Sequence, residues 1–347
     1  MKVISRASLV IVLAAFVVGC GGGTTPTTAP ATGPAGTGPT GEVDLDSVCA
    51  AGAEEGQLVL WHNLLDPPSI IDPWSERYPG MEVEYLDMRP DDAAQRVLTE
   101  AAAGQVTPDM LTGEIDHVLP LFERDLTGSP DWTALGIAED LITETGFVRT
   151  DRISGGIAYN TDMAGPEDLP DTWDELIDEQ YRGQLVVDPR GVPFNRLAPV
   201  WGADRTIEYV TELMEVVQPI VIEGGTAGMN AVVSGEALMS AGGRADSALQ
   251  MQAEGAPVEM KYMDLIATYD GYNVVLEGAR HPNAAMCFIG WIATEGAELY
   301  LEAESKFNDT IPPDAPEGAQ VVAVETPEDA GLVGDVAGQL GEIITGP

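Results

Sequence analysis

The strongest constraint on the fold is an alternation of short buried strands with amphipathic helices that begins at residue 57. Residues 57–61 form an apolar run of strand length, and residues 69–78 place Ile70, Trp74 and Tyr78 on one helical face. Further strands are predicted at 81–85 and 109–112, and a further helix at 92–103. This order predicts an α/β fold with a parallel sheet, helices on its faces and ligand loops at the carboxyl ends of the strands.

The same alternation restarts in the second half of the chain. Residues 153–160 form an apolar, glycine-containing strand suited to crossing between two lobes. Thr172 and Glu175 have the spacing of a capping box, which predicts a helix over 172–181 that ends at Gly183, before a strand at 184–188. Without its N-terminal segment, a chain of 347 residues is still long enough for two lobes that each have a core.

Residues 1–42 are predicted to direct export and attachment. Lys2 and Arg6 precede an apolar run too short to span a bilayer, which is typical of a signal peptide over residues 1–19. The run ends in Val17-Val18-Gly19-Cys20, which resembles the lipobox of bacterial lipoproteins. We therefore expect a lipid on Cys20, and the alternative is an ordinary secretory signal with a Cys at this place by chance. Residues 20–42, almost wholly Gly, Thr, Pro and Ala, are predicted to be a lipid-attached tether. The expected location is extracytoplasmic, at the outer face of the cell membrane.

The charge of the chain excludes one class of partner. Asp and Glu number 57 against 16 Lys and Arg, a net charge of -41, and the three lysines are Lys2, Lys261 and Lys306. Nucleic acid is excluded as a partner, because phosphate binding needs a basic surface. Such an acidic surface favours solubility at high salt and predicts a halophilic source.

Two cysteines remain if Cys20 is acylated. Cys49 and Cys287 are then an even pair in an oxidising compartment, Cys49 just before the first strand and Cys287 in a predicted helix. A disulfide between them and a pair of buried reduced thiols are both open.

Motifs of catalysis are missing from the sequence. It has no Gly-x-Ser-x-Gly elbow, no P-loop and no dinucleotide fingerprint, and His62, His117 and His281 lack zinc spacing. Carboxylate pairs arise by chance among so many acidic residues. We expect a binding protein without a cofactor, and not an enzyme.

A series of short motifs resembles a known family in residue types, order and spacing. The motifs lie at 53–61, 74–80 (Trp-Ser-Glu-Arg-Tyr-Pro-Gly), 81–85, 97–101, 155–162, 169–170, 173–176, 181–183, 234–236 (Ser-Gly-Glu) and 281–285 (His-Pro-Asn-Ala-Ala). Together they resemble the extracellular solute-binding proteins of ABC importers, specifically the group that includes the periplasmic ferric-iron-binding proteins. The likeness covers residues 53–301.

The resemblance implies a type II periplasmic-binding-protein fold, in which two α/β lobes are joined by two crossing strands and clamp a solute between them. The corresponding division of the chain is lobe 1 at 53–153, completed by 266–305, lobe 2 at 154–265, and a C-terminal segment at 306–347. The implied partners are a small molecule or ion, and the permease and ATPase of an ABC importer. We expect a monomer.

Family position, together with the rule that strand carboxyl ends carry the site, assigns the cleft loops. They are 62–66, 112–116, 190–194, 224–226, 242–244 and 269–272, with Tyr159 near the hinge. The candidate ligand-binding residues are His62, Asn63, Thr112, Gly113, Glu114, Tyr159, Arg190, Gly225, Thr226, Gly243, Arg244, Tyr269 and Tyr272.

Two arginines in glycine-rich loops favour an anionic ligand. The guanidinium groups of Arg190 and Arg244 can hold a carboxylate or phosphonate in bidentate fashion, with backbone N–H groups of the nearby glycines beside them. The alternative, equally open from sequence, is that each arginine pairs with a neighbouring acid and braces its loop. A small organic anion is the favoured solute.

Ferric iron is the second hypothesis. Iron-binding relatives carry adjacent tyrosines after the Ser-Gly-Glu motif, whereas this chain has Ala241 to Arg244 there, and Leu65 where those relatives have a His. We therefore favour no metal; Tyr262, Tyr269 and Tyr272 are the alternative iron ligands, because ferric iron prefers oxygen donors. Further alternatives are a polyamine, held by Asp66, Glu114 and Asp270, and a sensor lipoprotein without an importer.

Overall fold

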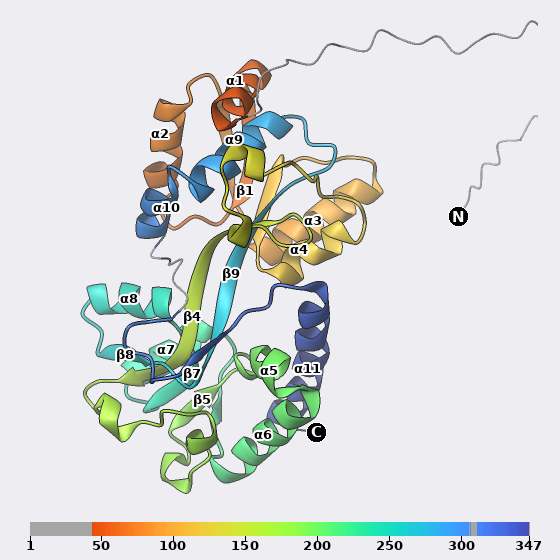
Figure 1. The fold of residues 1–347 in the computed structure, drawn as a ribbon. Coiled ribbons are helices and arrows are strands. Elements are labelled where there is room, and N and C mark those ends of the chain that lie inside the picture. The colour runs from red at the N-terminus through yellow and green to blue at the C-terminus, as the bar shows by residue number, and fades with distance from the viewer. Residues whose placement is uncertain (1–43, 305, 307–310, 347) are drawn as a thin grey trace, which may run out of the picture. The chain divides into compact units, whose positions relative to one another are not determined.

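Three parallel strands open the sheet, as the sequence predicts. The computed structural model describes residues 44–304, 306 and 311–346, so the predicted signal peptide, Cys20 and the tether lie outside the described residues. β1 (Gln57–His62) pairs in parallel with β2 (Glu82–Asp87) and with β3 (Met110–Gly113). The helices that follow these strands are α2 (Pro67–Arg77), α3 (Pro90–Ala102) and α4 (Ile115–Phe122) (Figure 1).

Two long antiparallel strands run through the centre of the sheet. β4 (Val148–Asn160) pairs with β9 (Leu265–Val275), with Ile153 opposite Tyr269. On one side β9 pairs with β3, and on the other β4 pairs with β7 (Met239–Arg244) and β8 (Val258–Lys261). The sheet order is β2-β1-β3-β9-β4-β7-β5-β6, which adds β5 (Leu185–Val187) and β6 (Ile220–Val221) in parallel to β7. The predicted α/β class and the crossing strands are confirmed.

The remaining elements cover these two sets of strands. The helices are α1 (Leu45–Glu55), α5 (Ala198–Trp201), α6 (Ala203–Val216), α7 (Gly225–Val233), α8 (Ala245–Ala253), α9 (Pro282–Ala293), α10 (Ala297–Ala303) and α11 (Pro327–Thr345). Short 3-10 helices are η1 (Thr133–Leu135), η2 (Glu139–Leu141), η3 (Pro166–Asp168), η4 (Asp174–Leu176), η5 (Glu179–Tyr181) and η6 (Phe194–Leu197). A last strand, β10 (Gln320–Val322), pairs in parallel with β9. Among the described residues, no helix combines the length and apolarity that a bilayer crossing needs.

Each set of strands has its own aromatic core. Beside β1, Trp74 and Phe288 are fully buried and meet edge to face, with ring centroids 5.4 Å apart. In the second set, Trp173 and Phe194 make the equivalent contact at 5.7 Å, among residues of β5 and α6. Such edge-to-face pairs stabilise a core beyond the area that they bury.

The C-terminal helix α11 connects the two sets of strands. It packs against α5 and α6 in the second set and also reaches α4, which follows β3 in the first. Thr326 caps the helix by accepting a hydrogen bond from the backbone N–H of Asp329 (3.1 Å). The sequence likeness described above ends before this helix, and no strand or helix was predicted for it.

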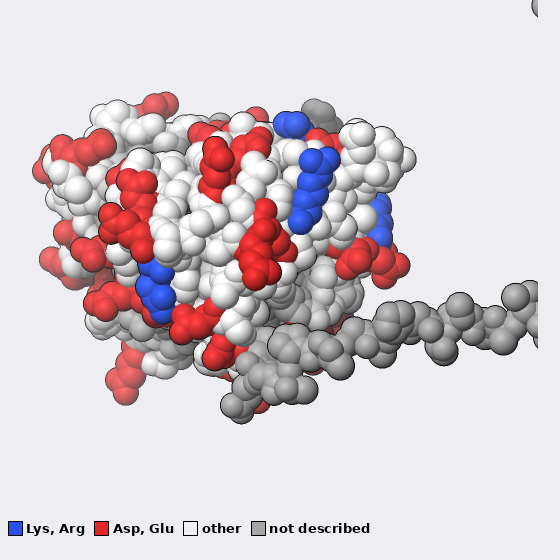
Figure 2. All heavy atoms as spheres, turned by 90° about the horizontal axis from the view of Figure 1, so that it is seen from above, with Lys and Arg blue, Asp and Glu red and all other residues white. Residues whose placement is uncertain are grey.

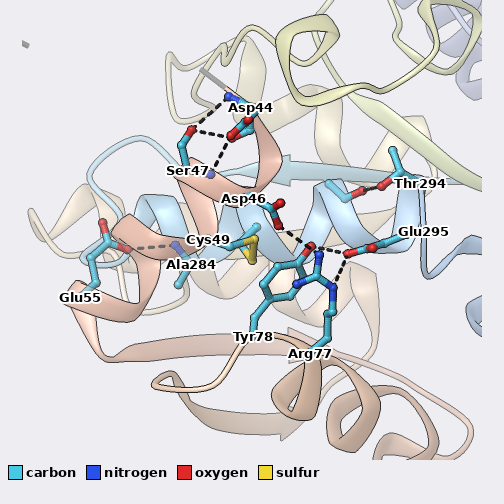
Figure 3. The surroundings of a disulfide bond; sticks show 12 residues. Asp44, Asp46, Ser47, Cys49, Glu55, Arg77, Tyr78, Ala284, Thr294 and Glu295 are labelled. Carbon is cyan, nitrogen blue, oxygen red and sulfur yellow. Dashed lines mark hydrogen bonds and ion pairs between the residues drawn. A yellow bond between two sulfur atoms is a disulfide. The ribbon is translucent and has the colours of Figure 1, made fainter. Parts of the chain in front are cut away.

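The N-terminal helix α1 was also missed by the sequence analysis, and it carries Cys49. Cys49 forms a disulfide with Cys287 of α9, with the two sulfur atoms 2.00 Å apart (Figure 3). The helices cross closely, because a Cβ on Gly52 would lie 2.9 Å from the backbone of Ala284. The Glu55 carboxylate accepts a hydrogen bond from the N–H of Ala284 (2.9 Å) and so caps α9.

We expect the Cys49 to Cys287 bridge to stabilise the fold by about 2–4 kcal/mol, because it closes a loop with a sequence separation of 238 residues in the unfolded chain. A double Cys49→Ala, Cys287→Ala variant should show this loss in chemical denaturation. A count of thiols in denatured, unreduced protein provides the control. Two free thiols would contradict the bridge.

The prediction of a helix over 172–181 was wrong. The capping bonds are present, because the N–H of Glu175 donates to Thr172 (3.2 Å) and the N–H of Thr172 donates to Glu175 (3.3 Å). The segment nevertheless forms only the 3-10 turns η4 and η5. The reason is tertiary: the N–H of Trp173 donates to Asp264 (3.0 Å) and the indole N–H donates to the Leu265 carbonyl (2.8 Å), which fixes the first turn against β9.

Two segments predicted as cleft loops are strands. Residues 242–244 belong to β7, where Gly243 lies opposite Gly156 and a Cβ would fall 2.5 Å from the backbone nitrogen of Ala158. Glycine is therefore needed here because two strands approach each other closely, and not because the chain turns. Residues 269–272 lie within β9, where pairing with β4 and burial of both tyrosines keep the chain extended.

Candidate functional site

A cleft of about 510 Å³ lies where β3, η6, β7 and β9 come together, with α11 along one side. Five of the predicted residues line it, namely Asn63, Glu114, Arg190, Arg244 and Tyr269. Asn63 and Glu114 directly follow β1 and β3, and Arg244 ends β7, so the strand-end rule located these three residues.

The sequence analysis missed other residues that line the same cleft. The polar ones are Arg89, Asp91, His117, Asn195 and Arg196, and the apolar ones include Val324, before α11, and Val333 of α11. His117 lies one residue beyond the predicted loop 112–116, whose last residue, Asp116, lines the cleft. Arg196 lies two residues beyond the predicted loop 190–194, within η6, and its burial has no sequence signal.

Arginine is concentrated in this cleft. Of the 16 Lys and Arg in the whole chain, four arginines line it. The outer surface is different: Figure 2 shows Asp and Glu spread widely over the face seen from above, with few basic side chains between them. In so acidic a protein, this group of guanidiniums makes the cleft the candidate binding site.

Arg196 and Arg244 meet around Tyr269. Each guanidinium carbon lies 4.6 Å from the centroid of the Tyr269 ring, within cation–π range. Arg196 Nη2 donates to Glu114 Oε2, and Arg244 Nη1 lies 3.8 Å from Glu114 Oε1. Arg196 Nη1 also donates to the Thr268 carbonyl (3.2 Å). One carboxylate thus faces two guanidiniums.

Neighbouring carboxylates keep these arginines charged. Burial is the largest influence and opposes the charge on Arg196, but the surrounding groups, with Glu114 first, together outweigh burial and raise the pKa of Arg196. Burial likewise opposes the charge on Arg244, and Asp246, which accepts from Arg244 Nη2 (3.1 Å), raises its pKa. Burial also raises the pKa of the Tyr269 phenol, so the hydroxyl stays neutral and can donate a hydrogen bond.

Arg190 takes part in a loop-bracing pair. Its Nε and Nη2 donate to the two carboxylate oxygens of Asp188 (3.0 and 2.7 Å), and Asp188 also accepts from the N–H of Gly224 (3.0 Å). Burial is the largest influence and would raise the pKa of Asp188, but the hydrogen bonds from Arg190 and from the Gly224 N–H, together with the Arg190 charge, outweigh burial and lower this pKa. The Arg190 side chain remains 55% exposed at the cleft.

Several predicted residues lie away from the cleft lining. Tyr159 is buried and its hydroxyl donates to Glu259 (2.8 Å), and the Tyr272 hydroxyl donates to Asp270 (3.3 Å) and to the Val324 carbonyl (3.2 Å). Asp270, named for a polyamine, is buried against Arg152. The remaining residues outside the lining are His62, Thr112, Gly113, Gly225, Thr226 and Gly243.

The three tyrosines of the iron alternative do not converge. Tyr269 lines the cleft, Tyr272 is bonded to Asp270, and Tyr262 lines a separate cavity of about 530 Å³ between α8 and β8. Burial raises the pKa of Tyr262 to about 12, which disfavours the phenolate that ferric iron prefers. Within the part of the chain that the structure describes, no group of three or more His, Cys, Asp or Glu is placed to hold a metal ion.

Comparison with protein families decides the class of protein. Residues 69–306 match the family described as bacterial extracellular solute-binding protein. The chain belongs to this family. Its members bind solutes rather than catalyse reactions, in agreement with the prediction from the sequence. A comparison with curated protein sequences finds no match.

Solved structures with the same fold include other solute-binding proteins. Iron-bound HitA from Pseudomonas aeruginosa has a TM-score of 0.67 and 18% identity, over 83% of this chain and 99% of HitA. A Trichodesmium protein (IdiA, FutA) in complex with iron and citrate ligands has 0.66 and 13%, over 84% and 98% of the two chains. The spermidine/putrescine ABC transporter substrate-binding protein PotD from Streptococcus pneumoniae has 0.62 and 15%, over 83% and 99%. The predicted type II periplasmic-binding-protein fold is confirmed.

His62 shows why a residue at the end of a strand of this solute-binding protein can miss the cleft. Side chains alternate along β1, so His62 shares the face of Leu58 and Leu60, which is buried against Trp74. Within the described part of the chain, neither ring nitrogen has a hydrogen-bond partner, and burial, followed by the nearby charge of Lys306, lowers the pKa of His62 to about 3. Asn63, one residue later, reaches the cleft instead.

This burial predicts that acid destabilises the fold through His62. The folded pKa lies below the unfolded value, so the unfolded chain binds more protons, and stability falls as the pH drops below about 6.5. Between pH 7 and pH 5 the loss from this residue is about 2 kcal/mol. Chemical denaturation of wild type and His62→Phe at both pH values measures the difference, since the carboxylates are common to both. Equal pH dependence in the two proteins would contradict the assignment.

Proposed function

We propose that this protein captures a small organic anion, a carboxylate or phosphonate, in the cleft beside Tyr269. The observation that carries the proposal is the pair of guanidiniums of Arg196 and Arg244 on either edge of one carboxylate, in a chain with a net charge of -41. Arginine presents a planar, permanently charged fork that matches carboxylate and phosphonate oxygens. The volume of the cleft, about 510 Å³, lies in the range of small-molecule sites.

The negative charge of the whole chain does not oppose this proposal at high salt. At about 1 M salt the screening length is about 3 Å, so distant carboxylates contribute little and the groups in contact with the ligand decide. Each charge-assisted bidentate pair then contributes about 1.5–3 kcal/mol, which is about tenfold to a hundredfold in affinity.

Calorimetry with a panel of small carboxylates and phosphonates tests the proposal, together with ferric citrate and spermidine. Ferric citrate enters because a structural neighbour was solved with iron and citrate, and spermidine because PotD is a spermidine/putrescine transporter protein. Mass spectrometry of whatever co-purifies in the cleft is the complementary measurement. Tight ferric binding with a tyrosinate charge-transfer band, and no binding of anions, would restore iron as the solute.

We further propose that the solute is handed to the permease and ATPase of an ABC importer. In this proposal lobe 1 (53–153 with 266–305) and lobe 2 (154–265) close on the solute, with β4 and β9 as the crossing strands. The family and the fold support a transport role. A sensor lipoprotein without an importer remains the alternative, which neighbouring permease and ATPase genes would argue against.

A lipid anchor at Cys20 is the proposed means of attachment. We expect the Cys20→Ser variant to move from the membrane fraction to the soluble fraction of expressing cells, because it removes the thiol that a lipid would modify. Cell fractionation with immunoblotting measures the change, and Thr24→Ser in the predicted tether serves as a control that leaves both Cys20 and the disulfide in place. Full membrane partitioning of Cys20→Ser would contradict the lipoprotein assignment.

A further inference from the structure

Side chains of both charges lie together in the cleft. Arg196 of η6 and Arg244 of β7 supply guanidiniums. Glu114 and Asp116, at the start of α4, supply carboxylates, and the Asp116 side chain is 58% exposed. A ligand in the cleft would therefore meet guanidiniums and carboxylates side by side.

We propose that the solute is a zwitterion, with its anionic group on Arg196 and Arg244 and its ammonium group on Glu114 and Asp116. This inference rests on the proposed anion-binding function and narrows the class of solute. It names amino acids or aminoalkylphosphonates as the chemical class.

In the structure, the Glu114 carboxylate lies against the two guanidiniums that we propose for the anionic group of the ligand. Its carboxylate accepts from Arg196 Nη2 and lies 3.8 Å from Arg244 Nη1, with the side chain 24% exposed. An incoming carboxylate must therefore compete with Glu114 for the same N–H groups. Glu114 acts as an internal counter-ion of Arg196 and Arg244.

Displacement of Glu114 favours a zwitterion over a plain anion. A plain anion on the arginines would leave the Glu114 carboxylate part-buried beside a second negative charge, without its partner. A zwitterion brings an ammonium group that replaces the lost guanidinium contacts of Glu114. Each charge then keeps a partner of opposite sign before and after binding.

Two polar atoms without hydrogen-bond partners among the described residues also favour a ligand that carries both an anionic and an ammonium group. Arg196 and Asn195 both line the cleft and are only 8% and 6% exposed, yet Arg196 Nε and Asn195 Oδ1 have no hydrogen-bond partner among the residues that the structure describes. The first is a donor and requires an acceptor, such as a carboxylate oxygen. The second is an acceptor and requires a donor, such as an ammonium N–H. A ligand with both kinds of group would satisfy both atoms.

The test is calorimetry with matched ligands. The panel consists of the common α-amino acids, ω-amino acids and aminoalkylphosphonates, each beside its deaminated and N-acetylated analogue. We expect the zwitterion to bind wild type about tenfold or more tightly than either analogue. In Glu114→Gln the deaminated acid should bind more tightly than in wild type, because the competitor is gone, and the preference for the zwitterion should fall to about threefold or less.

Two variants serve as comparisons. Glu123→Gln makes the same charge change at the exposed C-terminal end of α4 and should leave every affinity unchanged. Asp116→Asn should weaken the zwitterion by a few-fold and leave the deaminated acid unaffected. Thermal unfolding checks that each variant is folded.

The outcomes separate the inference from the function on which it rests. If deaminated acids bind wild type as tightly as zwitterions, and Glu114→Gln does not change their ratio, the inference is wrong while anion binding stands. If neither plain acids nor zwitterions bind, the proposed anion function itself fails.

Discussion

Replacement of Arg196 by alanine is expected to weaken binding of the anionic solute by about a hundredfold, at the upper end of what one charge-assisted bidentate pair contributes. The Arg196 side chain is only 10% exposed, lies against the Tyr269 ring and donates to Glu114, so its removal deletes a buried positive charge from the cleft. Arg244→Ala should weaken binding by at least about tenfold, because its more exposed guanidinium also remains engaged with Asp246. Isothermal calorimetry with the best anion of the panel measures both effects.

A matched control separates this effect from a general loss of charge. Arg205 also stacks on an aromatic ring, that of Trp201, and pairs with Asp174, but it lies on α6 and does not line the cleft. Arg205→Ala should leave anion affinity unchanged. Affinity that survives both Arg196→Ala and Arg244→Ala would place the anion elsewhere and contradict the proposed site.

The order of strands and helices was predictable because burial leaves a local pattern in the sequence. The apolar run of β1 and the helical face of Ile70 and Trp74 lie within single elements, so their periodicity reports the fold directly. The prediction of a helix over 172–181 failed because the backbone conformation of this segment is determined by Asp264 and Leu265, which are far away in the sequence. Helix α1 was missed because the segment before β1 was taken only as the approach to the first strand, although Asp44 and Ser47 form a capping box.

The candidate site was predictable only in part, for a related reason. The rule that loops at strand ends carry the ligand found Asn63, Glu114 and Arg244, because chain position alone places them at one edge of the sheet. It cannot tell which way a side chain points, and so it also named His62, which points into the core. Arg196 and α11 were missed because a buried arginine on a 3-10 turn, and a helix that returns from the C-terminus, enter the cleft through tertiary packing alone.

The second large effect is expected at the crossing strands, where an ion pair is buried. Arg152 of β4 donates from Nε and Nη2 to the two carboxylate oxygens of Asp270 on β9 (2.9 and 2.6 Å), with side chains 6% and 3% exposed. Arg152 Nη2 also donates to Glu325 (2.6 Å), directly before the residue that caps α11. The cluster therefore joins both crossing strands to the helix that flanks the cleft.

Asp270→Ala should destabilise the fold by about 3–5 kcal/mol, because it leaves the Arg152 charge buried with only the half-exposed Glu325 as a partner. The double variant Arg152→Met, Asp270→Leu should recover much of this loss, since it removes both charges and fills the space with apolar groups. Asp174→Ala, which breaks the exposed pair with Arg205, is the matched control and should cost less than about 1 kcal/mol. Urea denaturation of the four proteins measures these differences. If the single and double variants are equally unstable, the loss comes from packing rather than from the unpaired charge, and Arg152 and Asp270 do not act as an electrostatic connection between the crossing strands.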